Sequence, residues 1–560
     1  MSTFLAIDFG TSNCCAAIIN REKEIEFVPL DGESYFLSSA IFVQVNDFTR
    51  GKIDTFKLLD TANKLHKDDE KRYKEDLEIL KNRYRIFYNT YVPLAKDPNK
   101  PYKKNSLRKY VDSKDLKAAI ENFKLNQLAD EKKRLISEIK PVKDLSKIIS
   151  DLKIKFELNS IQGDIDFLSD ESFFTAILNS ESQIYFGNEA LKKYAENPLS
   201  GFFMRSPKAF LGTSLNSRSK ELFIKIISLI IEHIKIKSDK HFGINFTKVV
   251  FGRPVNYLGS NSISANNQAL SIMNAAALRM GFTDIRYVIE PFAAALVSRR
   301  TMFATSSPSI IIDIGGGTSD VAIITNDFNN QDTLKILSSS GSRVGGDDFD
   351  QSIAIKYFVQ ILKQNIPEFH SIIIDALNTR DLHAQSKFAK IGRNILEKLE
   401  RSKIPADKSF LFDLYRAQLQ HKVILFSESI KTTLGNNTSF VKSFDLIHSK
   451  LNFNYENCNF KDICQNQIKE IEDIIFKAID DSNLDKSSSK KVFITGGMSN
   501  SDILIQILKD LFPIGSVFYR LSPLNTIISG LAVAANHLSL HEINRPIASI
   551  YGIPIERFTD

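Results

Sequence analysis

The chain has 560 residues, of which 43% are hydrophobic and 25% are charged. This length and ordinary composition predict a globular protein of several domains, and they exclude a single small module and an intrinsically disordered chain. The net charge of +7 is unevenly spread, because residues 51–155 hold 27 Lys and Arg against 17 Asp and Glu. The basic character therefore belongs to one segment.

The cellular compartment is predicted from the N-terminus, the apolar runs and the cysteines. The N-terminus reaches an acidic residue early and lacks the basic flank and apolar run of a secretory signal. The most apolar helical stretch, 222–236, is interrupted by charges and is too short to span a membrane. Cys14 and Cys15 are adjacent in a predicted strand and point to opposite faces, while Cys458 and Cys464 have no nearby pair to complete a zinc site. We expect reduced thiols in a cytoplasmic protein with no membrane span.

The first half of the chain begins with a sheet and then changes character. Residues 1–45 alternate short apolar runs with turns, which predicts a β-meander. Residues 52–155 form long Lys-, Glu- and Leu-rich helical patterns, which indicate an inserted helical block. An amphipathic helix over 219–237 and a strand over 248–255 follow.

The second half continues the alternation of helices and strands. The patterns predict a helix over 267–280, a strand over 286–291, a helix over 293–300 and a strand over 309–317. A further strand is expected at Lys491, and an alanine-rich helix over 526–538 closes the pattern. The chain is therefore predicted to be α/β.

One motif occurs twice at long range. The segment Ile7-Asp8-Phe9-Gly10-Thr11-Ser12-Asn13 recurs as Ile312-Asp313-Ile314-Gly315-Gly316-Gly317-Thr318-Ser319-Asp320, and each copy is followed by Ala-Ile-Ile. Each copy predicts an apolar strand that ends in Asp, a glycine-containing turn and a second apolar strand. The repeat indicates two related halves.

The residue types in the repeat suit a phosphate ligand. Successive backbone N–H groups in a glycine-containing turn form an anion-binding concavity, and Thr and Ser hydroxyls add donors. The Asp at each strand end suits Mg²⁺ held through ordered water. A single copy could equally be a plain hairpin turn, but two matching copies favour a clamp on Mg²⁺-polyphosphate. The chain contains no GxxxxGK[ST] P-loop.

These motifs resemble those of the actin-like ATPase superfamily, specifically the DnaK-type heat-shock chaperones. The two repeat copies are similar to that family's phosphate motifs, and VGGDDFD at 344–350 is similar to the segment after the second. IEPFAAAL, SPKAFLG, SESIKTTL and ITGGMSN are similar to the segments of its catalytic glutamate, its active-site lysine and its adenosine contacts. The resemblance implies the actin-like ATPase (ribonuclease-H-like) fold, with two lobes around a nucleotide cleft.

The resemblance assigns roles to residues of this chain. It implies catalytic roles for Lys208, Glu290, Asp313 and Thr318, and hydrated Mg²⁺ on Asp8 and Asp313. It implies ATP or ADP contacts from Asp8, Gly10, Thr11, Ser12, Asn13, Gly315, Gly316, Gly317, Thr318, Gly345, Gly346, Glu428, Lys431, Gly496 and Gly497. Plainer readings are a solvated surface lysine at Lys208, a strand-end charge at Glu290 and an exposed i,i+3 ion pair between Glu428 and Lys431.

The chain departs from the family pattern in several places, among them the arginine that partners Pro254 in the family, which is not evident here. Gly435 stands where the family offers a hydroxyl to adenine, and Asn500 stands where it has a stacking arginine. The peptide-binding domain is expected to be absent, as in truncated YegD-type members, because the chain stops about twenty residues after its closing helix. The expected domains are lobe I over 1–308 with the insertion at about 50–160, lobe II over 309–525, and a crossover helix and tail over 526–560.

The resemblance implies a chaperone-like, Mg²⁺-dependent ATPase whose lobe motion is coupled to a protein client or co-chaperone. The alternatives are a nucleotide-gated scaffold or pseudo-ATPase without turnover, and a small-molecule kinase, which VGGDDFD disfavours. The insertion is expected to present a solvated, ion-paired helical face and to serve as a partner-docking surface. Its aromatic and basic residues would suit an anionic partner, but no nucleic-acid motif supports that use: Arg83, Tyr84, Arg85, Tyr88, Tyr91, Lys103 and Lys104.

Overall fold

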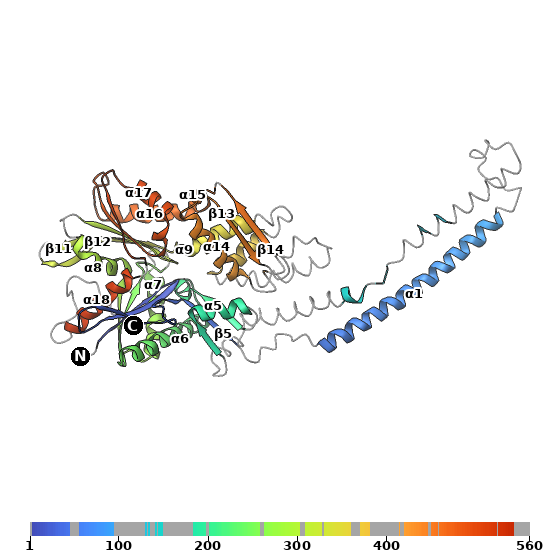
Figure 1. Cartoon of the computed structure of the whole chain (residues 1–560), viewed down its shortest axis with the longest axis horizontal. Coiled ribbons are helices and arrows are strands. Elements are labelled where there is room, and N and C mark those ends of the chain that lie inside the picture. The colour runs from blue at the N-terminus through green and yellow to red at the C-terminus, as the bar shows by residue number, and fades with distance from the viewer. Residues whose placement is uncertain are drawn as a thin grey trace. The chain divides into compact units, whose positions relative to one another are not determined.

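The computed structural model divides the chain into two compact units, residues 1–48 with 164–560, and residues 49–163 (Figure 1). The structure describes residues 3–44, 55–94, 129–130, 133–134, 141–142, 144–148, 183–197, 201–257, 263–302, 308–327, 330–359, 370–380, 414, 419–445, 450–456, 458–523 and 525–541. The first unit carries every motif of the sequence analysis, so it positions the candidate site.

Two sheets of the same design form the centre of the first unit. Sheet I has the order β3-β2-β1-β8-β9, and sheet II has the order β12-β11-β10-β15-β16. In each sheet the first strand of the repeated motif pairs antiparallel with the strand that follows it and parallel with a later strand. The sequence repeat is therefore also a repeat of topology, which confirms the predicted two-lobed α/β fold. The strands of sheet I are β1 (Leu5–Phe9), β2 (Asn13–Ile19), β3 (Ile25–Phe27), β8 (Lys248–Arg253) and β9 (Asp284–Ile289), with β4 (Leu37–Ser38) beside β2. Those of sheet II are β10 (Ser309–Ile314), β11 (Ser319–Asp327), β12 (Asn330–Ser342), β15 (Lys491–Thr495) and β16 (Val517–Arg520).

Helices cover one face of each sheet. Helices α6 (Ser217–Phe242) and α7 (Ile263–Arg279) pack with one face of sheet I, and α16 (Gln465–Asp481) packs on β11 and β12 of sheet II. Helix α6 is longer than its predicted pattern at both ends. Asn216 accepts a hydrogen bond from the Ser219 N–H at its start, and Gly243 follows its end with φ of 65°, so both ends carry ordinary capping residues.

A pair of helices fills the space between the two sheets. Helix α8 (Glu290–Met302) and helix α18 (Thr526–His541) share one hydrophobic core with the second face of both sheets. Cys15 lies in this core and its neighbour Cys14 lies in the core on the other face of sheet I, as strand alternation predicts. The two helices approach closely, because a Cβ on Gly530 of α18 would lie 1.9 Å from the carbonyl oxygen of Ala293 in α8.

Smaller elements extend each lobe. Lobe I, built on sheet I, adds a sheet of order β6-β5-β7 and a short helix; lobe II, built on sheet II, adds a hairpin and several helices. In lobe I these are β5 (Ala40–Gln44), β6 (Gln183–Phe186), α5 (Gly187–Glu196), β7 (Gly201–Arg205) and the 3₁₀ turn η2 (Pro207–Phe210). In lobe II they are α9 (Gly346–Ala354), the π-helical turn η3 (Ile355–Val359), α11 (His370–Leu377), α14 (Gln420–Leu434), β13 (Phe440–Asp445), β14 (Lys450–Tyr455), α15 (Phe460–Ile463), the 3₁₀ turn η6 (Gly497–Asn500) and α17 (Asp502–Asp510).

The second unit contains helix α1 (Thr55–Leu94). Arg72 pairs with Asp69 at 2.8 Å and with Asp76 at 3.6 Å, at the i,i+3 and i,i+4 spacing of an ion-paired helical face. The aromatic and basic side chains over 83–91, and residues 103–104, lie outside the described side chains and residues. Within the described ranges, no helix is long and apolar enough to cross a bilayer.

The close crossing of α8 and α18 predicts an unusual response to a helix-favouring substitution. In a helix interior, Gly→Ala ordinarily stabilises by about 0.5–1 kcal/mol. Gly530→Ala is instead expected to lower the free energy of unfolding by about 1–3 kcal/mol, because the added methyl must displace the Ala293 backbone. Denaturant unfolding of Gly530→Ala beside Asn536→Ala, on the same helix, measures this. A stabilised Gly530→Ala variant would contradict the crossing.

Candidate functional site

The turns of the two repeated motifs meet in the middle of the first unit. A Cβ on Gly316 would lie 1.8 Å from Ser12 Oγ, and one on Gly317 would lie 2.5 Å from Thr11 Cγ2. Only glycine permits this approach of the lobe II turn to the hydroxyl-bearing turn of lobe I. The two turns therefore face one another.

The segment after the second motif joins the same place. Gly345 packs on the Gly316–Gly317 peptide, where a Cβ would lie 2.6 Å from backbone atoms. The Gly346 N–H donates to the Gly315 carbonyl at 2.9 Å, and the Ser319 hydroxyl donates to the Val344 carbonyl at 2.7 Å. These bonds hold the N-terminus of α9 against the second turn, beside the first turn.

Four carboxylates and one lysine lie at the strand ends beside these turns. Asp8 is the second-last residue of β1, and Asp313 is the second-last residue of β10. Asp320 on β11 is the cross-strand partner of Asp313. Asp313 and Asp320 are buried, and so are Glu290 and Lys208. The Lys208 ammonium donates to Glu290 Oε1 at 2.6 Å. Lys208 is therefore not a solvated surface lysine, and Glu290, although it directly follows β9, is a buried charge paired with that lysine.

Burial and mutual repulsion perturb these groups strongly. Burial, with the charge of Glu290, raises the pKa of Asp8 to about 7 and that of Asp320 to about 8. Burial and the neighbouring carboxylates hold the pKa of Asp313 well above its usual range. Burial alone lowers the pKa of Lys208, but the charges of Glu290, Tyr257 and Asp8 outweigh it and leave that pKa raised. The cluster carries more acid groups than one lysine neutralises.

This donor set fits a hydrated dication. A divalent cation beside Asp8 and Asp313 would favour their ionised forms and relieve the repulsion that raises their pKa values. Among the described residues there is no group of three or more side chains placed to hold a metal directly. Mg²⁺ keeps several of its waters, so two carboxylates can hold it through that water shell.

The predicted adenosine residues lie on α14, next to α9. Lys431 donates to the Gly346 carbonyl at 3.0 Å and to Asp350 Oδ2 at 3.0 Å. Glu428 instead accepts from Arg205 of lobe I at 2.9 Å. The pair is therefore not the simple i,i+3 ion pair that its spacing also allowed. Both side chains connect α14 to the neighbouring segments of the cleft.

The loop that carries Gly496 and Gly497 lies beside the strand end of the second motif. Gly496 has φ of 85°, and a Cβ there would lie 2.2 Å from the Ile314 carbonyl and 2.6 Å from Asp313 Oδ1. Gly497 begins the turn η6 and faces open space. The loop after β15 thus passes directly over the end of β10.

Ser501 accounts for the unusual glycine at position 435. A Cβ on Gly435 would lie 3.0 Å from Ser501 Oγ, and the Ser501 hydroxyl donates to the Gly435 carbonyl at 3.4 Å. The same hydroxyl caps the N-terminus of α17 by accepting from the Leu504 N–H at 3.2 Å, so a larger residue at position 435 would disturb this cap. Asn500, in η6, precedes Ser501.

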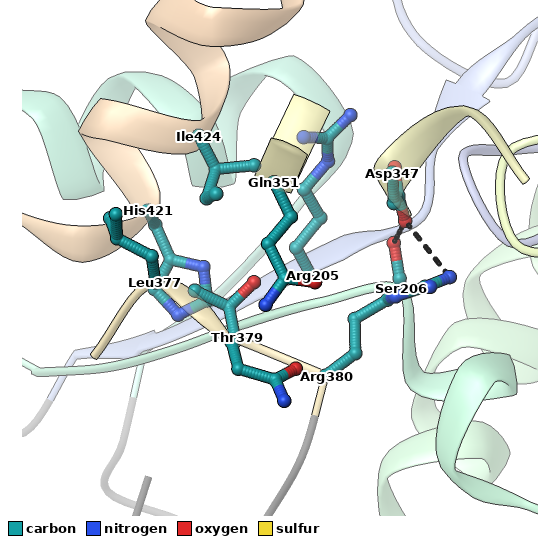
Figure 2. A pocket seen from close by; sticks show the side chains of 10 residues that line it. Arg205, Ser206, Asp347, Gln351, Leu377, Thr379, Arg380, His421 and Ile424 are labelled. Carbon is teal, nitrogen blue, oxygen red and sulfur yellow. Dashed lines mark hydrogen bonds and ion pairs between the residues drawn. The ribbon is translucent and has the colours of Figure 1, made fainter. Parts of the chain in front are cut away.

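The structure also adds residues that the motifs did not single out. Asp320 belongs to the repeat, but the resemblance implies no role for it. Its buried carboxylate accepts a hydrogen bond from the Val255 N–H at 2.7 Å and another from the Thr318 side chain. Arg205, Ser206 and Asp347 line a pocket whose walls come from both lobes, together with His421 and with Arg380, which reaches Asp347 (Figure 2). Asp320 could have been found from its place two residues after Thr318. The pocket residues are brought together only by folding.

The buried carboxylates predict a stability that depends on pH. A carboxyl whose folded-state pKa lies above its unfolded value of 3.8 loses stability as pH rises from that value through the folded pKa. Asp313→Asn is therefore expected to be more stable than the wild type by at least about 1 kcal/mol at pH 8, with the difference shrinking towards pH 4.

Nucleotide-free thermal melts across this pH range test the expectation. Asp445→Asn is the matched control, because the Asp445 side chain is 71% exposed. A pH-independent stability difference between Asp313→Asn and the wild type would show that ionisation of the Asp313 carboxyl does not destabilise the folded protein.

Comparison with known proteins gives matches to one superfamily. The family model described as MreB/Mbl protein matches residues 224–439. The chain is 29% identical to the chaperone protein DnaK of Mycoplasmopsis agalactiae over 189 residues, which cover 33% of this chain and 29% of that protein. It is 22% identical to the chaperone protein dnaK1 of Synechocystis over 312 residues, which cover 56% of this chain and 38% of that protein. The chain thus matches less than half the length of each relative. With its paired sheets and facing turns, the chain has the two-lobed α/β fold of the actin-like ATPase superfamily.

Proposed function

We propose that the protein binds Mg²⁺-ATP between its two lobes and hydrolyses it to ADP and phosphate, as a chaperone-like protein similar to DnaK. The observation that carries the proposal is the contact of the two repeated turns beside Asp8 and a buried cluster of Asp313, Glu290 and Lys208. Phosphoryl transfer to water needs donors for the phosphates, a metal and an oriented nucleophile, and this cluster offers residues of each kind.

The phosphates would lie between the two turns. Backbone N–H groups of residues 316–317, with the hydroxyls of Thr11 and Ser12, would supply donors from both lobes. Because the two turns touch, the lobes must open for a polyphosphate to enter and would then close around it. Nucleotide binding is thereby coupled to lobe motion.

Different residues would bind the metal and carry out catalysis, with Asp313 serving in both roles. Bound Mg²⁺ neutralises phosphate charge, and Asp8 and Asp313 would hold its water shell. Glu290, Asp313 and Thr318 would orient the attacking water, and Lys208 would stabilise the γ-phosphate charge as the bond to the β-phosphate oxygen breaks. Lys208 and Glu290 lie together here, with 2.6 Å between Nζ and Oε1.

The adenosine would lie towards α14. Glu428 and Lys431 are held in place by Arg205 and Asp350, and the loop at Gly496 passes beside them over β10. A protein client or co-chaperone would read the lobe motion, and the second unit offers a separate surface for a partner. The alternative of a nucleotide-gated scaffold shares the binding site but not the turnover.

Lys208 is the residue whose removal separates these alternatives. Lys208→Ala is expected to lower phosphate release by roughly 10²-fold, because a preorganised charge at the transition state is lost. Its Kd for Mg²⁺-ATP should change by only a few fold. Calorimetric titration and phosphate release, measured together, give both quantities.

Lys192→Ala is the control for this comparison, because the Lys192 side chain is 74% exposed on α5. Equal losses of binding and turnover in Lys208→Ala would contradict the catalytic role. Wild-type protein that binds Mg²⁺-ATP without releasing phosphate would favour the scaffold.

A further inference from the structure

The residues before Lys208 form a turn with an uncommon backbone conformation. Ser206 has φ of 58° and ψ of 50°, in the left-handed region that few non-glycine residues adopt. It is buried, its N–H donates to the Ser39 carbonyl at 2.8 Å, and its carbonyl accepts from the Ala209 N–H at 3.0 Å. A residue persists in this conformation only when its surroundings fix it, and such residues gather at functional sites.

Lobe II supplies part of these surroundings. The Ser206 hydroxyl donates to Asp347 Oδ2 at 3.2 Å, and the preceding Arg205 donates to Glu428 Oε2 at 2.9 Å. Figure 2 shows Ser206 and Arg380 meeting at the Asp347 carboxylate from two sides. The turn therefore belongs to lobe I but is tied to two helices of lobe II, α9 and α14.

Asp347 is in turn fixed to the second motif. Its backbone N–H donates to the Gly316 carbonyl at 2.8 Å, at the tip of the turn that faces Ser12. A short series of contacts thus runs from Gly316 through Asp347 to Ser206. Only Pro207, with its restricted φ, separates Ser206 from Lys208, so a displacement of Ser206 is passed on to Lys208.

We propose that Ser206 is a positioning residue, whose hydroxyl bond to Asp347 places Lys208 for catalysis only when the two lobes are closed. The inference rests on the proposed ATP hydrolysis and adds how closure is sensed at the lysine. When lobe II moves away, the bond to Asp347 breaks and the turn loses its support from that side. Lys208 then moves relative to the γ-phosphate, and a misplacement of about 1 Å can cost up to about 10²-fold in rate.

The test compares two substitutions at one position. Ser206→Ala removes the hydroxyl, so kcat should fall about tenfold or more, while the Kd for Mg²⁺-ATP stays within about twofold. Ser206→Asn should recover most of the lost kcat, because Asn tolerates the left-handed conformation and its amide can donate to Asp347. A role in stability alone would not produce this split between kcat and Kd.

Two further variants complete the test. Asp347→Ala removes the bond to Ser206 and also the contact of the carboxylate with Arg380, so its kcat should fall at least as far as that of Ser206→Ala. The double variant should be no slower than Asp347→Ala. Thr213→Ala is the control: its hydroxyl donates to Phe210 within the same lobe at 2.7 Å, and its loss should leave kcat unchanged. Thermal melts of all variants show which of them fold.

The outcomes separate this inference from the proposed function. Unchanged kcat in Ser206→Ala, equal losses in kcat and binding, or additive losses in the double variant would overturn the positioning role while the wild type still hydrolyses ATP. A wild type that binds Mg²⁺-ATP without phosphate release would contradict the proposed function and this inference together.

Discussion

The contact between the two repeated turns is the constraint on which the rest of the site depends. Ser12 and Thr11 lie directly against Gly316 and Gly317, and no larger residue fits at either glycine. The paired sheets present the turns at matching strand ends, and the shared core of α8 and α18 holds the sheets on either side. A change in the angle between the lobes therefore acts first at these turns.

The second constraint is electrostatic. Asp313, Asp320 and Glu290 are buried together with Lys208, and Asp8 lies beside them as a fourth acid group. Such a cluster stores repulsion in the nucleotide-free protein, and a bound dication with its phosphates would release it. The acid groups lower the stability of the nucleotide-free protein but allow the site to bind a cation, and functional sites often reduce stability in this way.

The sequence predicted the features that depend on local pattern. The repeated Asp-Gly-Thr-Ser motifs predicted two matching hairpins, and the change of composition near Lys52 predicted a separate helical block. The sequence could not predict contacts between distant segments, because no local pattern encodes them. Glu428 and Lys431 illustrate this, since their spacing suggested one another as partners but each pairs with a residue elsewhere. Ser206 likewise owes its left-handed backbone to Ser39 and Asp347, far away in the chain.

The central claim is that the facing turns bind polyphosphate with Mg²⁺, and that adenosine adds contacts on α14. The most direct test is calorimetric titration of the nucleotide-free protein with ATP and with inorganic tripolyphosphate, each with Mg²⁺ and with EDTA. The account predicts Mg²⁺-dependent binding of both ligands, tighter for ATP. Binding of neither ligand, or equal ATP binding in EDTA, would contradict it.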